Sequence, residues 1–355
     1  MTEVKKFSEV QYLDRNESQY GPSPKCYEYL KNVPMTDISW YSRDFVRGIK
    51  SRLSERIAND FGFKESQIIL SYGSEDILKQ VIHRYLSMGE KILIPKQAWW
   101  YYKKVAYEVE GMNVEYPMVK GKIDDVDSYL YDVDKMISIY DRERPKIVLV
   151  ASPNNPTGNM IPKEDLGRFL DACRGAIVMI DEAYWGFGSM DNSYVKPYID
   201  EYPNLLICRT FSKYFAMAGC RIGFSFAGNN LEGLKGYTTR YLGYNLISEK
   251  LAEIALDDNE YYKKVTKMMQ EDKEYFYEEF GKMEGFTPYK SFANFMLVDI
   301  PTNIRKDLKK FLTEKNILIK FLNEEAFKTE ARITLGTREQ NHALIESIKE
   351  FLGTK

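Results

Sequence analysis

Short apolar runs alternate with longer amphipathic segments along the first two thirds of the chain. Each run is rich in Ile, Val and Leu, which is typical of strands buried on both faces of a parallel sheet. These runs lie at 67–72, 91–95, 146–151, 176–184 and 205–207. Other segments carry apolar residues at helical spacing, as Ile49, Leu53 and Ile57 do within 47–60. The alternation from 68 to 225 predicts a three-layer α/β domain with a mostly parallel sheet.

The rest of the chain is expected to form an N-terminal arm and a second, smaller α/β domain. We place the arm at 1–35, the large domain at 36–235 and the small domain at 236–355, and the arm contributes to the small domain. A long helical segment at about 249–280 is expected to link the two domains. Further predicted elements are a helix at 25–31, strands at 114–118, 291–298 and 316–321, and a solvated polar excursion with a helix at 120–134.

The composition fits a globular protein of about two domains. The chain has 355 residues, of which 44% are hydrophobic and 29% charged. Its net charge of -2 provides no overall field that would attract nucleic acid. Tyrosine is frequent, with 27 residues, and residues 99–104 mix aromatics with lysine. Because the charge is nearly balanced, we interpret these aromatics as a packed, partly exposed surface rather than as a base-stacking site.

Cysteine and histidine usage argues against a disulfide framework and against a metal site. The four cysteines, Cys26, Cys173, Cys208 and Cys220, have no paired spacing, and the two histidines do not form a metal-binding pair. The N-terminus has no signal-peptide pattern, and no apolar run approaches the ~18 residues of a membrane span. The sequence therefore predicts a cytoplasmic protein that binds neither membrane nor nucleic acid.

The segment 209–223 carries the most informative chemistry. Lys213 follows two hydroxyl residues, Thr210 and Ser212, and Arg221 comes eight residues later. A lysine amine can form a Schiff base with a carbonyl, and the coenzyme that most often uses this reaction is pyridoxal 5′-phosphate. Its phosphate dianion needs hydroxyls, backbone N–H groups and an arginine nearby. The segment therefore predicts a site for this coenzyme.

Two further loops follow predicted strands and carry matching chemistry. The string 152–158, Ser-Pro-Asn-Asn-Pro-Thr-Gly, forms a rigid loop at a strand end, where Asn155 can donate to the coenzyme's phenolic oxygen. Asp181 ends a long apolar run, so its carboxylate must be paired, and a protonated pyridine nitrogen would meet that need. Tyr184 can donate beside Asn155, and an alternative interpretation places Tyr184 in the core.

A strand, a glycine and a helix start at 67–76 form a further anion site. The free N–H groups of a helix N-terminus and its dipole face an anion, so Gly73, Ser74 and Glu75 are candidates for holding the phosphate. We expect Ser74 to cap this helix. Any strand-to-helix turn shares this geometry, so this turn indicates a phosphate site only in combination with the two loops described above.

Together these motifs resemble the fold-type I pyridoxal-phosphate enzymes, and among them they are most similar to the histidinol-phosphate aminotransferase family. The resemblance extends over nearly the whole chain. It includes Tyr-Gly-Pro-Ser-Pro at 20–24, a Ser-x-x-Asn-Phe strand at 291–295, and Arg-Ile-Thr-Leu-Gly-Thr-Arg-Glu at 332–339. It implies a three-layer α/β/α large domain, a small α/β domain and a homodimer.

The resemblance also implies roles for individual residues. Lys213 is the Schiff-base lysine, Arg221 binds the phosphate, and Trp100, five residues after Pro95, stacks on the pyridine ring. Tyr41 is expected to reach the phosphate of the partner subunit's coenzyme. Tyr20 lies in a turn that lines the active site, and Arg332 binds the substrate's anionic group.

The sequence departs from the family pattern where substrate contacts are expected. Ser18 and Gln19 replace the usual Asn-Pro, and Lys320 stands in a strand where histidinol-phosphate enzymes usually carry an arginine. We therefore do not assume histidinol phosphate as the substrate. Because Arg332 and Lys320 together offer more positive charge than one carboxylate needs, we expect a small amine or amino acid that bears a phosphate or phosphonate.

The leading functional hypothesis is an aminotransferase that moves an amino group between a donor such as glutamate and a small carbonyl compound. Lys213 would act as general base and acid at the reacting carbon, with Asp181 and Tyr184 assisting at the coenzyme. An alternative is a decarboxylase of an O-phospho amino acid, since relatives of the family catalyse that reaction. A third hypothesis, a binding protein without catalysis, is disfavoured by the intact set of Lys213, Asp181 and Asn155.

Overall fold

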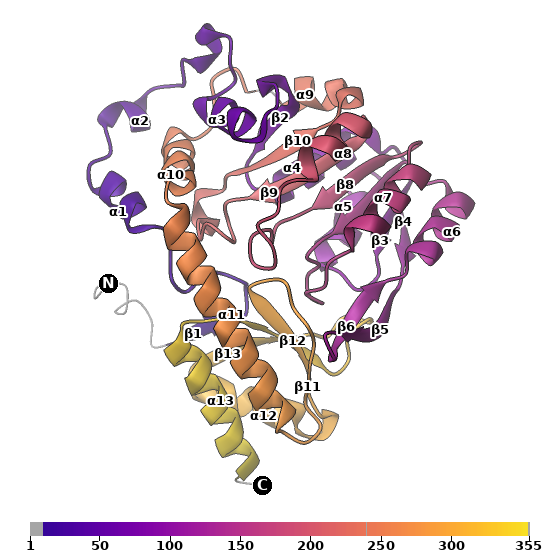
Figure 1. The fold of residues 1–355 in the computed structure, drawn as a ribbon, viewed down its shortest axis with the longest axis vertical. Helices are drawn as coiled ribbons and strands as arrows, with labels where there is room; N and C mark the ends of the chain where they lie inside the picture. The colour runs from indigo at the N-terminus through magenta and orange to yellow at the C-terminus, as the bar shows by residue number, and fades with distance from the viewer. Residues whose placement is uncertain (1–9, 239, 354–355) are drawn as a thin grey trace.

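The described chain is built on two large sheets, each covered by helices, and it has a separate two-stranded sheet (Figure 1). The computed structural model describes residues 10–238 and 240–353. Residues 1–9 of the predicted arm therefore lie outside the described residues. Within the described ranges, no helix is both long enough and apolar enough to cross a bilayer.

The larger sheet has seven strands in the order β2-β10-β9-β8-β7-β3-β4. These strands are β2 (Ile68–Ser71), β3 (Lys91–Pro95), β4 (Met112–Tyr116), β7 (Ile147–Ala151), β8 (Ile177–Asp181), β9 (Leu205–Thr210) and β10 (Gly223–Ala227). Only β10 runs antiparallel to its neighbours in this sheet. The predicted mostly parallel sheet is confirmed. Its parallel strands end at one edge, where the motif-bearing loops begin.

Helices cover both faces of this sheet. One face packs against α4 (Ser74–Tyr85), α5 (Trp100–Tyr107) and α9 (Glu232–Thr238). The other packs against α3 (Arg52–Phe61), α6 (Val133–Glu143), α7 (Lys163–Ala172) and α8 (Val195–Glu201). The chain therefore has the predicted three-layer α/β/α arrangement.

Two predicted helix starts are shifted in the structure. The helix expected at 47–60 begins at Arg52, because Ser51 caps it by accepting from the Leu53 amide at 2.9 Å. The preceding 3₁₀ turn, Asp44–Arg47, ends at Gly48 with φ of +81°. Gly73 rather than Ser74 occupies the N-cap position of α4, so Ser74 is the first helical residue.

The structure contradicts the sequence prediction for residues 120–134. Instead of a solvated excursion and helix, β5 (Met118–Ile123) and β6 (Val126–Tyr131) form an antiparallel hairpin before α6 begins at Val133. Contacts with the small sheet hold the hairpin. Lys120 Nζ donates to the Tyr289 hydroxyl at 2.6 Å, and the Tyr129 hydroxyl donates to Glu330 at 3.0 Å. These partners lie far away in the sequence, so the local pattern did not reveal them.

The smaller sheet has the order β1-β13-β14-β12-β11. Its strands are β1 (Gln11–Leu13), β11 (Thr287–Pro288), β12 (Phe295–Asp299), β13 (Ile317–Phe321) and β14 (Glu330–Thr334). The N-terminal β1 pairs parallel with β13, so the arm joins this sheet. Helices α12 (Thr302–Glu314) and α13 (Arg338–Gly353) pack beside α11 (Asn259–Gly281) around it (Figure 1).

The long helix predicted at 249–280 is interrupted. It consists of α10 (Leu246–Leu256) and α11, which runs beside the small sheet (Figure 1). The break lies at Asp258, whose carboxylate accepts from Lys25 Nζ at 3.1 Å and from the Ser23 hydroxyl. Ser23 also caps α1 (Pro24–Lys31), which is followed by the short helix α2 (Met35–Ser39). The arm therefore attaches where the two linking helices meet.

Candidate functional site

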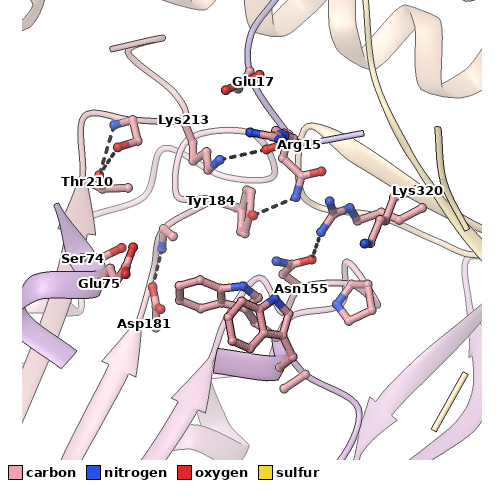
Figure 2. Close-up of a pocket in the computed structure, with 18 of the residues that line it drawn as sticks. Arg15, Glu17, Ser74, Glu75, Asn155, Asp181, Tyr184, Thr210, Lys213 and Lys320 are labelled. Atoms are coloured by element: carbon pink, nitrogen blue, oxygen red, sulfur yellow. Dashed lines mark hydrogen bonds between the residues drawn. The ribbon is translucent and has the colours of Figure 1, made fainter. Parts of the chain in front are cut away.

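A cavity of about 720 Å³ lies between the carboxyl ends of the parallel strands and the small sheet. It brings together all of the predicted site residues except Gly73, Tyr20 and Tyr41. Those that line it are Ser74, Glu75, Trp100, Asn155, Asp181, Tyr184, Thr210, Ser212, Lys213, Arg221, Lys320 and Arg332. The anion-site candidates Ser74, Glu75 and Thr210 lie on one side of Lys213, and Asn155 and Lys320 lie on the other (Figure 2).

Lys213 projects into the middle of this cavity (Figure 2). Its Nζ donates to the Arg15 carbonyl at 3.2 Å and lies 5.9 Å from the centre of the Tyr184 ring. Burial lowers the pKa of the Lys213 amine to about 8, and the charges of Arg332 and Arg221 act in the same direction. A pKa near 8 leaves a fraction of this amine neutral at neutral pH, as a nucleophile or general base requires.

Asp181 lies at the carboxyl end of β8 and is only 5% exposed. One carboxylate oxygen accepts from the Tyr102 hydroxyl at 2.7 Å, and the other accepts from the Ala183 amide at 2.9 Å. Burial raises the pKa of Asp181, which these two hydrogen bonds oppose. Asp181 forms no ion pair with any described residue. A cationic ring N–H would supply the compensating charge.

The anion-binding end of the cavity is built from α4, β9 and the loop before β10. Thr210 Oγ1 and Ser212 Oγ are 2.9 Å apart, and Arg221 Nη2 donates to the Tyr72 carbonyl at 3.3 Å. None of the described side chains caps the amino end of α4. A Cβ at Gly73 would lie 3.0 Å from Arg221 Nη2, so glycine permits this close approach. Hydroxyls, helix amides and a guanidinium together fit a phosphate dianion.

The opposite end of the cavity contains a hydrogen-bond network around Asn155. Arg332 Nη1 donates to Asn155 Oδ1 at 2.6 Å, which leaves the Asn155 amide group to donate. Asn16 Nδ2 donates to the Tyr184 hydroxyl at 2.8 Å, and burial raises the pKa of Tyr184. Tyr184 therefore keeps its proton and can donate it to a bound oxyanion. The Asn155 amide and the Tyr184 hydroxyl are therefore both suitable donors to the phenolic oxygen of the coenzyme.

Besides Gly73, two predicted residues lie outside the cavity of their own chain. The Tyr20 ring packs against the core, and its carbonyl accepts from the Tyr261 hydroxyl at 3.1 Å, which ties this turn to α11. Tyr20 therefore makes no contact with this cavity. Tyr41 is 72% exposed on the segment between α2 and the 3₁₀ turn. Trp100 lines the cavity and is 51% exposed, whereas the neighbouring Trp99 is more buried and also lines it.

Several cavity residues were not predicted from the sequence. Those with polar or bulky side chains are Asp14, Arg15, Asn16, Glu17, Tyr102, Leu322, Glu324 and Phe327. Asn16 and Glu17 directly precede Ser18 and Gln19, which depart from the family pattern, and their position before the Tyr-Gly-Pro turn was a usable signal. Tyr102 gave no comparable signal, because its partner Asp181 is 79 residues away.

The residues present fit pyridoxal 5′-phosphate. The donor set at one end suits its phosphate, Lys213 suits its aldehyde, and the buried Asp181 needs a cationic donor such as its ring nitrogen. Among the described residues, no group of three histidine, cysteine or carboxylate side chains could hold a metal ion.

A model of the class I and II aminotransferases matches residues 46–348. The chain belongs to this family. It is 31% identical over 341 residues to a histidinol-phosphate aminotransferase from Ruminiclostridium cellulolyticum, covering 95% of this chain and 91% of the relative. It is 32% identical over 343 residues to the enzyme of that name from Clostridium beijerinckii, with coverage of 96% and 90%.

A solved structure supports the same fold. Histidinol-phosphate aminotransferase from Sinorhizobium meliloti, in complex with pyridoxal-5′-phosphate, is 22% identical and aligns with a TM-score of 0.82, covering 95% of this chain and 90% of the other. The chain is therefore a pyridoxal-phosphate-dependent aminotransferase of fold type I, as the sequence predicted. The decarboxylase alternative is not favoured, because the two relatives named above are aminotransferases.

Proposed function

We propose that this aminotransferase moves an amino group between a donor such as glutamate and a small carbonyl compound that carries a phosphate. The observation that carries the proposal is the pairing of Lys320 with Arg332 across β13 and β14. Both residues line the cavity, and neither forms an ion pair with a described residue. Like charges directly opposite each other are destabilising, and a bound dianion would relieve that repulsion. The names of the relatives support a phosphorylated substrate.

Glu324 lines the same end of the cavity as these two cations. It lies too far from Arg332 and Lys320 to form an ion pair with either. Its charge therefore offsets part of the positive potential without occupying the donors that an anion would use. Arg332 already donates from Nη1 to Asn155 and from Nη2 to the Asp14 carbonyl, so its remaining N–H groups and the Lys320 ammonium are the donors open to an anion. Together they match a phosphate better than they match one carboxylate.

The predicted coenzyme-site residues have proposed roles in the reaction. The coenzyme, when bound, supplies an electron sink next to the reacting carbon. Lys213 Nζ holds the coenzyme, then takes the proton from Cα of the amino donor, and later returns a proton to the product. Asp181 holds the proton on the ring nitrogen, and Asn155 and Tyr184 donate to the phenolic oxygen. The side chains of Ser74, Thr210, Ser212 and Arg221, with the backbone at Gly73 and Glu75, would surround the phosphate. The Glu75 carboxylate lies 3.7 Å from Arg221 Nη2.

Substitution of the two substrate-end cations tests the proposal. Arg332→Ala and Lys320→Ala should each raise the KM for a phosphorylated substrate by roughly ten- to a hundredfold, because a charged hydrogen bond is lost. The KM for the dephosphorylated analogue should change far less. Steady-state kinetics with both analogues measures the difference.

Lys309→Ala is a matched control, because Lys309 is an exposed lysine on α12 outside the cavity. It should leave both KM values unchanged. Equal effects of Lys320→Ala on both analogues, or better turnover without the phosphate, would show that this end binds another group.

The exposed apolar surface supports a homodimer. Met35, Ile38, Trp40, Tyr41 and Val46 are 56–89% exposed on the segment around α2. This segment adjoins residues 241–242, where Phe45 and Tyr241 lie 4.9 Å apart between ring centres and the Ser42 amide donates to the Leu242 carbonyl at 3.1 Å. Several large apolar side chains exposed on one short segment indicate an interaction surface. A second copy would bury it and bring the partner's Tyr41 toward a phosphate.

We expect the enzyme to have twice the 41.5 kDa mass of the chain in light scattering. Val46→Glu should weaken the dimer and lower activity, since a charge would be buried at the interface. Val119→Glu is the control, because Val119 is exposed on the β5–β6 hairpin. A monomer with full activity at assay concentration would contradict the dimer.

Two coarser proposals complete the description. We propose that the two sheets mark two domains, with boundaries near residues 35 and 235 and the cavity between them. All four cysteines are unpaired, and three of them are buried. Unpaired thiols fit the reducing cytoplasm, where we propose that the enzyme acts.

A further inference from the structure

The family motifs do not explain how the buried carboxyl group of Asp181 stays ionised. To hold a proton on the ring nitrogen it must be ionised, yet it is buried and no described cation pairs with it. Several groups face it: Tyr102 from α5, Tyr131 from β6, Cys208 from β9, and Glu182 and Tyr184 from the loop that follows β8. None of these is cationic, so the carboxylate depends on hydrogen bonds.

Tyr102 supplies the side-chain hydrogen bond. Its hydroxyl donates to Asp181 Oδ2 at 2.7 Å, and its ring is only 4% exposed. Trp99 holds this ring edge to face, with centroids 5.7 Å apart. Burial beside Asp181 raises the pKa of Tyr102 well above its usual value, so the hydroxyl stays protonated and can only donate to the carboxylate.

The other tyrosines near Asp181 have different partners. The Tyr131 hydroxyl donates to the Ala151 carbonyl, and the Tyr184 hydroxyl accepts from Asn16. The Ala183 amide donates to Asp181 Oδ1, but it belongs to the backbone after β8 and is common to any residue there. Tyr102 is therefore the side chain through which the chain sets the charge and direction of Asp181.

We propose that Tyr102 is a positioning residue for the aminotransferase reaction, whose hydroxyl keeps Asp181 ionised and aimed at the ring nitrogen of the coenzyme. This inference rests on the proposed role of Asp181. Two fixed hydrogen bonds, one on each oxygen, restrict rotation of the carboxylate, so its remaining lone pairs keep one direction. Loss of the hydroxyl would favour the neutral acid, which cannot hold the ring proton.

The test uses coenzyme-free protein and two probes. One is pyridoxal 5′-phosphate, and the other is its carba-analogue, in which a C–H replaces the ring nitrogen. Tyr102→Phe should weaken binding of pyridoxal 5′-phosphate by about ten- to a hundredfold, as expected for a hydrogen bond to a charged group. Binding of the carba-analogue should be unchanged or tighter, because it makes no N–H contact with Asp181. Equilibrium dialysis measures both dissociation constants.

Tyr116→Phe is the matched control. Tyr116 is a fully buried tyrosine of the same domain, and its hydroxyl donates to the Leu149 carbonyl at 3.0 Å, away from Asp181. This variant should leave the ratio of the two dissociation constants unchanged. If Tyr102→Phe weakened both probes equally, the hydroxyl would serve packing only, and the inference would be overturned.

Asp181→Asn separates this inference from the proposed function. If Asp181→Asn weakens binding of pyridoxal 5′-phosphate more than binding of the carba-analogue, and Tyr102→Phe does not, only the inference about Tyr102 fails. If Asp181→Asn binds both probes equally well, the proposed role of Asp181 fails and takes the inference with it. If Tyr102→Phe alone folds poorly, the double variant Tyr102→Phe/Asp181→Asn still allows the test, because it has no buried carboxylate that has lost its hydrogen bond. In the Asp181→Asn background, Tyr102→Phe should no longer change the ratio, and a full effect there would contradict the coupling.

Discussion

Replacement of Lys213 by Ala is expected to lower the rate of amino transfer by at least about 10³-fold. The side chain supplies both the covalent hold on the coenzyme and the base at the reacting carbon. Its depressed pKa of about 8 follows from burial and from Arg332 and Arg221. Among the residues that the structure describes, Lys320 is the one other lysine that lines the cavity. Lys320 lies at the far end, on β13.

The Lys213→Ala protein should still bind pyridoxal 5′-phosphate without a covalent bond. The anion site at Thr210, Ser212 and Arg221 does not depend on the lysine. Borohydride reduction followed by peptide mass spectrometry should label the segment containing Lys213 in wild type and no segment in the variant. A reducible linkage that persisted in the variant would show that another lysine carries the coenzyme. Lys146→Ala, an exposed lysine before β7, should keep both label and activity.

The second large effect is expected for Asp181→Asn, which should lower turnover by roughly 10²- to 10³-fold. The substitution keeps the size of the side chain and removes the charge that holds the ring proton. Wild-type-like transamination in this variant would rule out the proposed pairing. Asp200→Asn, at an exposed aspartate of α8, should leave turnover unchanged.

Although Asp181→Asn should lower turnover, it should not lower the stability of the coenzyme-free protein. Burial raises the pKa of Asp181 in the folded state above its unfolded value, so the native state binds the proton more tightly. The stability associated with this group is therefore present at low pH and is lost as pH rises through the folded pKa. At neutral pH the ionised carboxylate costs stability, and Asp181→Asn should leave the melting temperature unchanged or higher. Calorimetry without coenzyme checks this sign.

The sequence by itself determined the large sheet and much of the proposed coenzyme site. Buried parallel strands appear as continuous apolar runs, and ligands bind beyond their carboxyl ends. Asp181 ends such a run, and Asn155 and Lys213 lie in the loops that follow two others, so local order along the chain was enough to place them. Arg221 was predicted from its position eight residues beyond Lys213, from the need of a phosphate for an arginine, and from the family resemblance.

Only the tertiary structure decided the features that depend on distant partners. The β5–β6 hairpin is polar along much of its length, and its contacts to Tyr289 and Glu330 come from residues more than 150 positions away. The break between α10 and α11 coincides with the contacts of Asp258 to Ser23 and Lys25.

The charge environment of the site was likewise a tertiary property. Tyr102 sits in a stretch of aromatics whose pattern indicates only packing, and its bond to Asp181 exists because α5 lies over the end of β8. Lys320 and Arg332 became a pair only through the register of β13 and β14. Short-range motifs specify which groups a loop carries. Burial and hydrogen bonding, which set the ionisation of those groups, are decided by residues that the fold brings together from far along the chain.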